Sequence, residues 1–251
     1  MADTRKTVLI TGAGVGGIGG SLAKEFHLKG YRVFATARDL TTVQELADKY
    51  SIETLHLDVT STDSVQAAAK EISQRTGGKL DVLVNNAGLG VVTPATDLLI
   101  DTVVKSMFEV NVFGVMRMVQ EFSGQLIAAE GTILTRVSKI VTGGIKTNIA
   151  RHGTTLRQGS IYMPILDFFH KRVKDSQDGA MDRDVYARSV VAQVMKPDWR
   201  KPAWFWKGNK ASIVWFIRTF LWSTAFDFRM MRVFGLFKLK RIVAAEKSKK
   251  D

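Results

Sequence analysis

The chain has 251 residues and a formal net charge of +12 at pH 7, and this length suits one α/β domain with a full core. It contains no cysteine, which excludes disulfides, thiolate catalysis and cysteine-ligated metals, and the spacing of its four histidines fits no metal site. Positive charge gathers at the end, because Arg200 to Asp251 includes thirteen Lys or Arg and only three Asp or Glu. We therefore expect a nearly neutral domain over residues 1–203 and a basic, tryptophan-rich region over residues 204–251.

Residues 7–128 alternate short apolar runs with longer helical patterns. The expected elements are a strand at 7–11, a helix at 18–29, a strand at 31–37, a helix at 41–50, a strand at 54–57, a helix at 64–74, a strand at 80–84 and a helix at 101–128. Strict alternation is typical of a parallel sheet with right-handed helical crossovers. The sequence therefore predicts an α/β fold with a doubly wound parallel sheet, of the Rossmann-like type.

A glycine-rich segment, Thr11–Gly20, connects the first predicted strand to the first helix. A bound pyrophosphate needs backbone N–H groups close to its oxygens, and residues without side chains permit that approach. Glycines also collect in ordinary turns, but a position between a strand and a helix favours a nucleotide site. We therefore predict that this loop holds the phosphates of a dinucleotide.

The regular alternation stops after residue 130. Gly131–Leu134 has the pattern of the start of a fifth strand, and Ile140–Gly144 has that of the end of a sixth. Parallel neighbours need a crossover of about a dozen residues or more, but only Thr135–Lys139 lies between these runs. We therefore predict that the strand–helix–strand unit is truncated, with room for a single strand made from pieces of two.

Five motifs occur in an order found in a known enzyme family. They are Thr11-Gly12 with Gly16-Gly17-Ile18-Gly19, Asp58-Val59, Asn85-Asn86-Ala87-Gly88, Asn111, and Thr142 to Thr147. Together they resemble the short-chain dehydrogenase/reductase family over most of the chain. The resemblance implies cofactor contacts from Thr11, Gly12, Gly16, Gly17, Ile18, Gly19, Asp58, Val59, Asn85, Ala87, Gly88, Thr142, Gly143 and Thr147. It also implies that Asn111 is the helix-borne asparagine of the active site.

The end of the second predicted strand bears on the choice of cofactor. NAD sites of this fold usually have an acidic residue there, which accepts a hydrogen bond from the ribose 2′-hydroxyl. Here Arg38 comes first, and its guanidinium suits a 2′-phosphate by charge and geometry. Asp39 follows as the alternative ribose partner, and Arg38 can also be read as a solvated loop charge. We predict NADPH.

The catalytic pair of the family is absent from the sequence. Members use a tyrosine as proton donor with a lysine four residues later, and none of the tyrosines at 31, 50, 162 and 186 has such a lysine. Ser138 stands at the distance of the family's serine from Gly131, but it can equally belong to the sixth strand. Tyr162 with Lys139 or Lys146 is the only substitute pair that we find. We therefore expect an impaired ketone reductase. The alternative is a non-catalytic NADP-binding protein or a truncated product of splicing or gene prediction.

Loss of the catalytic helix would also affect assembly. In the family, that helix pairs with the one carrying the active-site asparagine at the dimer interface. Its absence would expose the apolar residues Val112, Met116 and Val119, so we expect a disrupted dimer interface and reduced stability or aggregation.

Three later segments narrow the resemblance. Residues 159–165, 184–188 and 206–210 resemble a fungal branch of the family, the NADPH-dependent 1-acyldihydroxyacetone-phosphate reductases. This resemblance implies a lipid-like ketone substrate in glycerolipid synthesis and a location at the endoplasmic reticulum membrane or lipid droplet surface, on the cytosolic face. A cytoplasmic location is the alternative.

The C-terminal region contains an apolar stretch, Ser212–Phe226, which is interrupted by Arg218. It is too short and too charged for a good membrane span, which needs about 20 predominantly apolar residues. The Lys and Arg residues that follow favour an interfacial helix on an anionic membrane. An ordinary C-terminal helix packed on the domain is the alternative. No nucleic-acid recognition motif accompanies the basic patch, so we expect no nucleic-acid partner.

Overall fold

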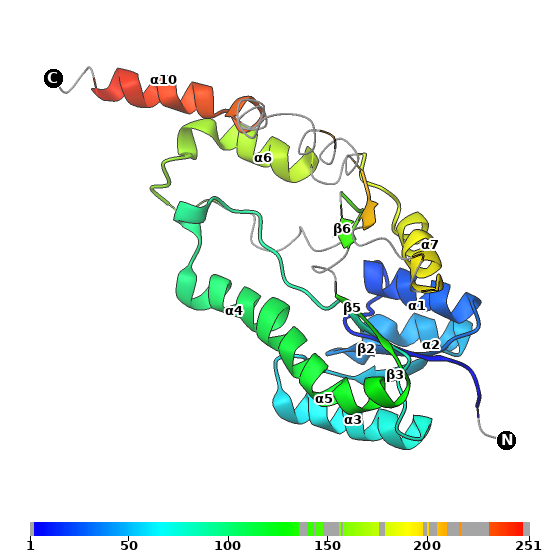
Figure 1. Cartoon of the computed structure of the whole chain (residues 1–251). Helices are drawn as coiled ribbons and strands as arrows, with labels where there is room; N and C mark the ends of the chain where they lie inside the picture. The colour runs from blue at the N-terminus through cyan, green and yellow to red at the C-terminus, as the bar shows by residue number, and fades with distance from the viewer. Residues whose placement is uncertain are drawn as a thin grey trace.

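The computed structural model describes residues 3–135, 140–142, 144–147, 156, 158–175, 179–197, 200, 205–209, 216 and 231–247. Its main sheet has five parallel strands in the order β3-β2-β1-β4-β5 (Figure 1). The strands are β1 (Thr7–Ile10), β2 (Arg32–Ala37), β3 (Glu53–His56), β4 (Val82–Asn85) and β5 (Thr132–Thr135). The strand order reverses between β1 and β4, as doubly wound folds require, so the predicted fold class is confirmed.

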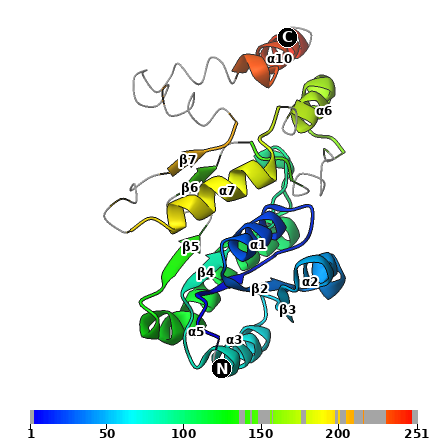
Figure 2. The same ribbon diagram turned by 90° about the vertical axis from the view of Figure 1, so that its right-hand side faces the viewer.

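Helices cover both faces of the main sheet (Figure 2). One core contains residues of α1 (Ile18–Leu28), α2 (Gln44–Tyr50) and α7 (Arg183–Val194), and the other contains residues of α3 (Thr62–Thr76) and α5 (Gly114–Ala128). Successive side chains of β1 alternate between the two cores, with Val8 and Ile10 in the first and Leu9 in the second. All residues of β1 and β4 are buried, which explains why these strands read as continuous apolar runs.

The predicted helix at 101–128 is one helical run whose hydrogen bonding changes along its length. It consists of η3 (Ile100–Val104), α4 (Lys105–Phe108), η4 (Glu109–Phe113) and α5, and both η3 and η4 are π-helical. Within this run, Glu109 forms an ion pair of 2.6 Å with Arg117. Short π-helical stretches are rare and occur frequently at functional sites, and η4 carries Asn111.

The strand β6 (Ile140–Thr142) does not join the main sheet. It pairs in parallel with β7 (Phe205–Lys207) in a separate two-stranded sheet. The prediction of one strand made from pieces of two is therefore wrong. Residues 136–139, which lie outside the described residues, join β5 to β6, and four residues span at most about 14 Å. A parallel crossover needs far more chain than this, so β6 cannot lie beside β5 as a parallel neighbour.

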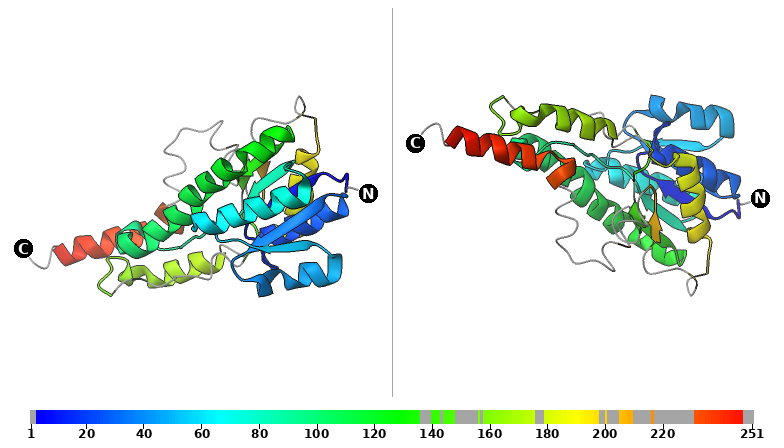
Figure 3. Two further views of the ribbon diagram at one scale, coloured as in Figure 1. Left: turned by 90° about the horizontal axis from the view of Figure 1, so that it is seen from below. Right: turned by 90° about the horizontal axis from the view of Figure 1, so that it is seen from above.

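The remaining helices lie away from the main sheet (Figures 1 and 3). Here α6 (Leu166–Asp175) follows the short helix η6 (Met163–Ile165), and α10 (Leu236–Lys247) lies beside it. Lys238 of α10 joins the two helices, because its Nζ lies 3.8 Å from Asp167 Oδ2 and 5.6 Å from the ring centre of Phe168. Among the described helices, none combines the length and apolar composition of a membrane span. Apart from Phe216, the predicted interfacial segment Ser212–Phe226 lies outside the described residues.

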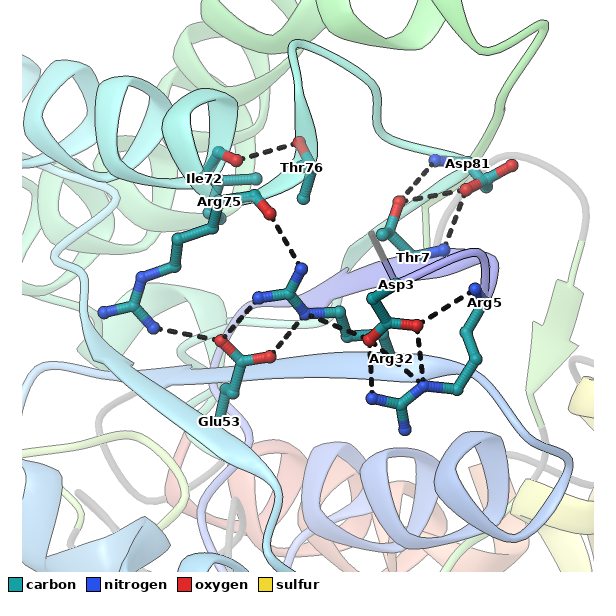
Figure 4. A network of polar contacts seen from close by, with 9 residues as sticks. All are labelled: Asp3, Arg5, Thr7, Arg32, Glu53, Ile72, Arg75, Thr76 and Asp81. Atoms are coloured by element: carbon teal, nitrogen blue, oxygen red, sulfur yellow. Dashed lines mark hydrogen bonds and ion pairs between the residues drawn. The ribbon is translucent and has the colours of Figure 1, made fainter. Parts of the chain in front are cut away.

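A polar network ties together the amino ends of the strands (Figure 4). Glu53 of β3 accepts from Arg32 Nε at 2.6 Å and from Arg75 Nη1 at 3.0 Å. Burial raises the pKa of Glu53, but hydrogen bonds and charge from the two arginines outweigh it and leave this pKa lowered. Nearby, Asp81 Oδ2 accepts from the Thr7 N–H at 2.7 Å, which joins β1 to the residue before β4. This network stabilises the amino ends of the strands, and the candidate site lies at their opposite, carboxyl ends.

Candidate nucleotide-binding cleft

A cleft of about 940 Å³ opens where β1, β2, β3 and β4 end. In doubly wound sheets, ligands bind at this edge, next to the reversal of strand order. The cleft is lined by nine of the predicted site residues: Gly12, Gly17, Ile18, Arg38, Asp58, Val59, Ala87, Gly88 and Thr147. Residues that are far apart in the sequence therefore meet in one cavity.

The glycine loop between β1 and α1 has no space for side chains at Gly12, Gly19 and Gly20. Gly12 has a φ of +63°, and a Cβ there would lie 2.8 Å from Ala87 Cα. A Cβ on Gly19 would meet the Gly12 carbonyl oxygen and would lie 2.9 Å from Ala13 Cα. Glycine is therefore required by backbone conformation and close approach, as in loops that cradle a phosphate.

The start of α1 leaves its first amides available to a ligand. Its N-cap, Gly17, makes no side-chain capping bond, and the first turn holds no acidic residue. The first N–H groups of any helix lack intrahelical partners and carry the positive end of the helix dipole. Because Gly17 and Ile18 line the cleft, the loop fits a phosphate.

The loop after β4 is fastened to the glycine loop by Asn86 and Thr11. The Thr11 hydroxyl oxygen accepts from the backbone N–H groups of Asn86 at 3.0 Å and Ala87 at 2.9 Å. In return, Asn86 Nδ2 donates to the carbonyl oxygens of Thr11 at 3.0 Å and Gly12 at 2.9 Å. The two walls of the cleft therefore hold each other in place.

The loop after β2 carries Arg38 and Asp39, the two candidate partners of the ribose, and they differ in the contacts that they make. Asp39 Oδ1 accepts from the Thr41 hydroxyl at 2.7 Å and from the Thr41 N–H at 2.9 Å, so it caps the helix η1 (Leu40–Val43). These bonds lower the pKa of Asp39. Arg38 lines the cleft, and its positive charge helps to lower the pKa of Asp58. At Asp58, burial raises the pKa, but hydrogen bonds from Thr60 and the charge of Arg38 outweigh it, so this pKa is lowered.

Asn111 holds the loop after β4 from the other side. Its Oδ1 accepts from the Leu89 N–H at 2.9 Å, and its Nδ2 donates to the Leu89 carbonyl oxygen at 2.8 Å. Both polar atoms of the side chain are therefore engaged by one backbone residue. Asn111 does not itself line the cleft, although Leu89 does.

Other predicted site residues lie beside the cleft or outside the described residues. Thr11, Gly16, Gly19 and Asn85 support the loops but do not line it. The Asn85 side chain is buried, and its Nδ2 donates to Thr135 Oγ1 at 3.4 Å. Thr142 belongs to β6. Ser138, Lys139 and Gly143 lie outside the described residues.

The proposed substitute pair is not assembled in the described part of the chain. Tyr162 lies in the turn before η6 and is not among the described residues that line the cleft. Lys146 is exposed, and its N–H donates to the Met181 carbonyl oxygen at 3.0 Å. The geometry therefore gives no support to Tyr162 and Lys146 as proton donor and partner.

Sequence reasoning missed a second group of lining residues, namely Thr42, Thr60, Asn86, Lys105, Ser106, Glu109 and Val110. The last four follow helical spacing, and that pattern could have indicated a shared face on α4 and η4. Asn86 could have been found from its place in the motif Asn85-Asn86-Ala87-Gly88, because the other three residues of that motif were predicted to contact the cofactor. In the described residues, no group of three His, Asp or Glu side chains could hold a metal ion.

Comparison with known proteins agrees with this geometry. The model of the short chain dehydrogenase family matches residues 6–151, which is more than half of the chain. This chain belongs to the short-chain dehydrogenase family. Members of this family bind a nicotinamide cofactor.

Fungal relatives in this family match almost the whole chain. The short-chain dehydrogenase srdE of Neurospora crassa is 36% identical over 99% of this chain and 98% of its own. That alignment spans 292 positions whereas this chain has 251 residues, so the relative has at least 41 residues without a counterpart here. An NADPH-dependent 1-acyldihydroxyacetone phosphate reductase of Schizosaccharomyces pombe is 47% identical over 53% of this chain and 44% of its own.

Solved structures show the same fold. A short-chain dehydrogenase from Streptomyces avermitilis superposes with a TM-score of 0.70 at 20% identity and covers 97% of this chain and all of its own. The KRED1-Pglu enzyme superposes with a TM-score of 0.63 at 19% identity, over 80% of this chain and 99% of its own. At these identities the likeness concerns the fold alone.

Proposed function

We propose that this short-chain dehydrogenase binds NADPH and is related to reductases of a lipid-like ketone, the 1-acyl-dihydroxyacetone phosphates, but turns over slowly or not at all. The observation that carries the proposal is the cleft, in which the glycine loop, Arg38 and Asp58–Val59 meet. When bound, NADPH would supply a hydride to a carbonyl carbon. The chain's own residues would bind the phosphates, position the adenosine and shield the cofactor from water.

The preference for NADPH rests on Arg38. Arg38 and Asp39 both line the cleft after β2, and Asp39 already uses one carboxylate oxygen to cap η1. A guanidinium matches a 2′-phosphate by charge and by its paired donors. The NADPH dependence stated in the name of the Schizosaccharomyces pombe relative supports the same choice.

Impaired turnover rests on the missing Tyr-x-x-x-Lys unit. A proton donor must lie within hydrogen-bond reach of the substrate oxygen, and no tyrosine of this chain has a lysine four residues later. The short link between β5 and β6 and the length difference from the Neurospora crassa relative both support loss of the crossover helix. Sequencing the transcript from Leu134 to Val141 distinguishes a native junction from a misassembled one. An in-frame Tyr-x-x-x-Lys segment there would make this chain a truncated form of a working reductase.

Fluorescence titration of NADPH and NADH tests the cofactor assignment. We expect wild type to bind NADPH at least tenfold more tightly, and Arg38→Gln to lose most of that preference, since one charge-assisted interaction contributes about 1.5–3 kcal/mol. Lys70→Gln removes an equal charge from the exposed face of α3 and serves as control. Equal affinities for the two cofactors in wild type would reject NADPH preference.

A second proposal concerns the C-terminal helices, which we infer to contact an anionic membrane surface such as that of the endoplasmic reticulum or a lipid droplet. In and before α10, exposed Val233 and Val243 accompany the exposed cations Arg232, Lys240 and Arg241. Apolar side chains interspersed with cations suit the interface of an anionic bilayer. Flotation with vesicles containing phosphatidylserine should recover the protein, and paired Lys240→Glu and Arg241→Glu changes should reduce recovery. Equal recovery with neutral vesicles would contradict the electrostatic part of this proposal.

A further inference from the structure

A short segment before and within α7, Met181–Asp184, contacts the stretch before Thr147 at one end and the glycine loop at the other. The Met181 N–H donates to the Gly144 carbonyl oxygen at 2.9 Å, and the Met181 carbonyl oxygen accepts from the Lys146 N–H at 3.0 Å. Thr147, which follows Lys146, lines the cleft. One end of the segment is therefore bound to the wall that carries Thr147.

The other end of the segment is bound to the glycine loop and to α1. Arg183 Nη1 donates to the Gly16 carbonyl oxygen at 3.3 Å. The next residue, Asp184, accepts from the Ser21 hydroxyl at 2.5 Å through its Oδ1. Asp182 caps α7 by accepting from the N–H groups of Asp184 at 2.8 Å and Val185 at 3.1 Å. The cap fixes the start of α7 and therefore the point from which Arg183 extends.

The stretch around Gly16 depends on contacts of this kind, because Gly14, Gly16 and Gly17 have no side chains of their own to hold them. Besides the bonds from Asn86, the Ala13 N–H donates to the Thr36 carbonyl oxygen at 2.9 Å, and the Val15 N–H donates to the Thr42 carbonyl oxygen at 2.8 Å. Both reach the β2 side of the loop. Arg183 holds Gly16, which has a φ of +86°, from the α7 side.

The charge of Arg183 adds a second effect. A cation beside the amino end of a helix is disfavoured by the helix dipole, and an anion there is favoured. Gly16 directly precedes Gly17, the N-cap of α1, and the first turn of that helix has no acidic residue. Arg183 does not itself line the cleft, so its charge would act on a bound phosphate from behind the glycine loop rather than by contact.

We propose that Arg183 is a positioning residue of the nucleotide cleft, which holds the glycine loop through Gly16 and raises affinity for the pyrophosphate of the dinucleotide. This inference rests on the proposed NADPH site. It assigns to a residue of α7, far from the family motifs in the sequence, a part in cofactor binding.

Two ligands and three variants test the inference. NADPH occupies the whole cleft, whereas adenosine 2′-monophosphate lacks the pyrophosphate and reports only the Arg38 end. The variants are Arg183→Gln, Arg183→Lys and the control Arg188→Gln, which removes an equal charge from an exposed position of the same helix. Circular dichroism and a thermal melt establish that each variant is folded.

We expect Arg183→Gln to weaken NADPH binding roughly tenfold, the size expected for one charge-assisted contact, with adenosine 2′-monophosphate unchanged. Arg183→Lys should recover most of the loss, and NADPH binding by Arg183→Gln should depend less steeply on salt than in wild type. The inference is overturned if Arg183→Gln binds NADPH as wild type does, if it loses both ligands equally, or if Arg188→Gln behaves the same way. Wild type that binds neither ligand would instead refute the NADPH site itself.

Discussion

The two parts of the sheet differ in what surrounds them. β1 and β4 have a strand on each side and a helical layer on each face, and all their residues are buried. β5 is an edge strand, and its Ile133 is 41% exposed. Residues 7–128 form complete strand–helix units around the cleft, and we refer to them as the cofactor half. Beyond β5, where we propose that a crossover helix is lost, only residues 136–139 separate β5 from β6.

The same contrast occurs along one helix. Met118 of α5 is fully buried against the sheet, whereas Met116 is 53% exposed on the opposite side. Val112 and Phe113 are also exposed, and Val119 is half-buried. The inner face of this helix belongs to the cofactor half, and its outer face is apolar without being covered in the described part of the chain.

The largest expected effect is on the free energy of unfolding, and it differs between the two faces of this helix. Met118→Ala should lower the free energy of unfolding by about 2–5 kcal/mol, because it leaves a cavity in the core. Met116→Ala should change it by less than about 0.5 kcal/mol, as for an exposed site. Urea denaturation of both variants measures the difference. Similar losses would mean that the outer face is buried in solution, for example in a dimer.

A second pair of variants tests the close approach at the glycine loop. Gly19→Ala should destabilise the fold by about 1–3 kcal/mol and abolish NADPH binding, because the added Cβ meets Gly12, Ala13 and Asn86. Gly124→Ala meets nothing within 4 Å and should stabilise α5 by about 0.5–1 kcal/mol. Thermal melts and NADPH titration measure both. Normal binding by Gly19→Ala would show that this loop does not pack as described.

The smallest expected effect concerns the network at the opposite edge of the sheet. Glu53→Gln should cost about 1–2 kcal/mol, whereas Glu45→Gln, which breaks only an exposed pair with Lys49, should cost less than about 0.5 kcal/mol. Both losses are measured by urea denaturation at neutral pH. Equal losses for the two variants would show that the Glu53 network stabilises the fold no more than the exposed pair of Glu45 and Lys49 does.

Low pH should remove the difference in unfolding free energy between wild type and Glu53→Gln. The folded-state pKa of Glu53 lies below its ordinary value of 4.5, so its contribution to stability is complete above that value and is lost as pH falls through the folded-state pKa. The difference in unfolding free energy between wild type and Glu53→Gln should therefore shrink as the pH is lowered below 4.5. A difference that stays constant with pH would show that charge is not its cause.

The cofactor half could be predicted because its signals are local. Apolar runs mark the strands, and Thr11–Gly20 places the glycine loop between a strand and a helix. What the sequence did not reveal depends on contacts between distant residues. The pairing of β6 with β7, the engagement of Asn111 by Leu89 and the bond from Arg183 to Gly16 have no local pattern. The π-helical stretches were also missed, because their side-chain pattern is that of an ordinary helix.

The central claim is that the cofactor half is complete while turnover is lost. The most direct test follows NADPH binding by fluorescence and NADPH oxidation by absorbance in one sample, with and without 1-acyl-dihydroxyacetone phosphate. The account predicts saturable binding of NADPH and no oxidation above the rate without protein. Steady oxidation that depends on the ketone would contradict it, because the chain would then hold a proton donor outside the family's motif.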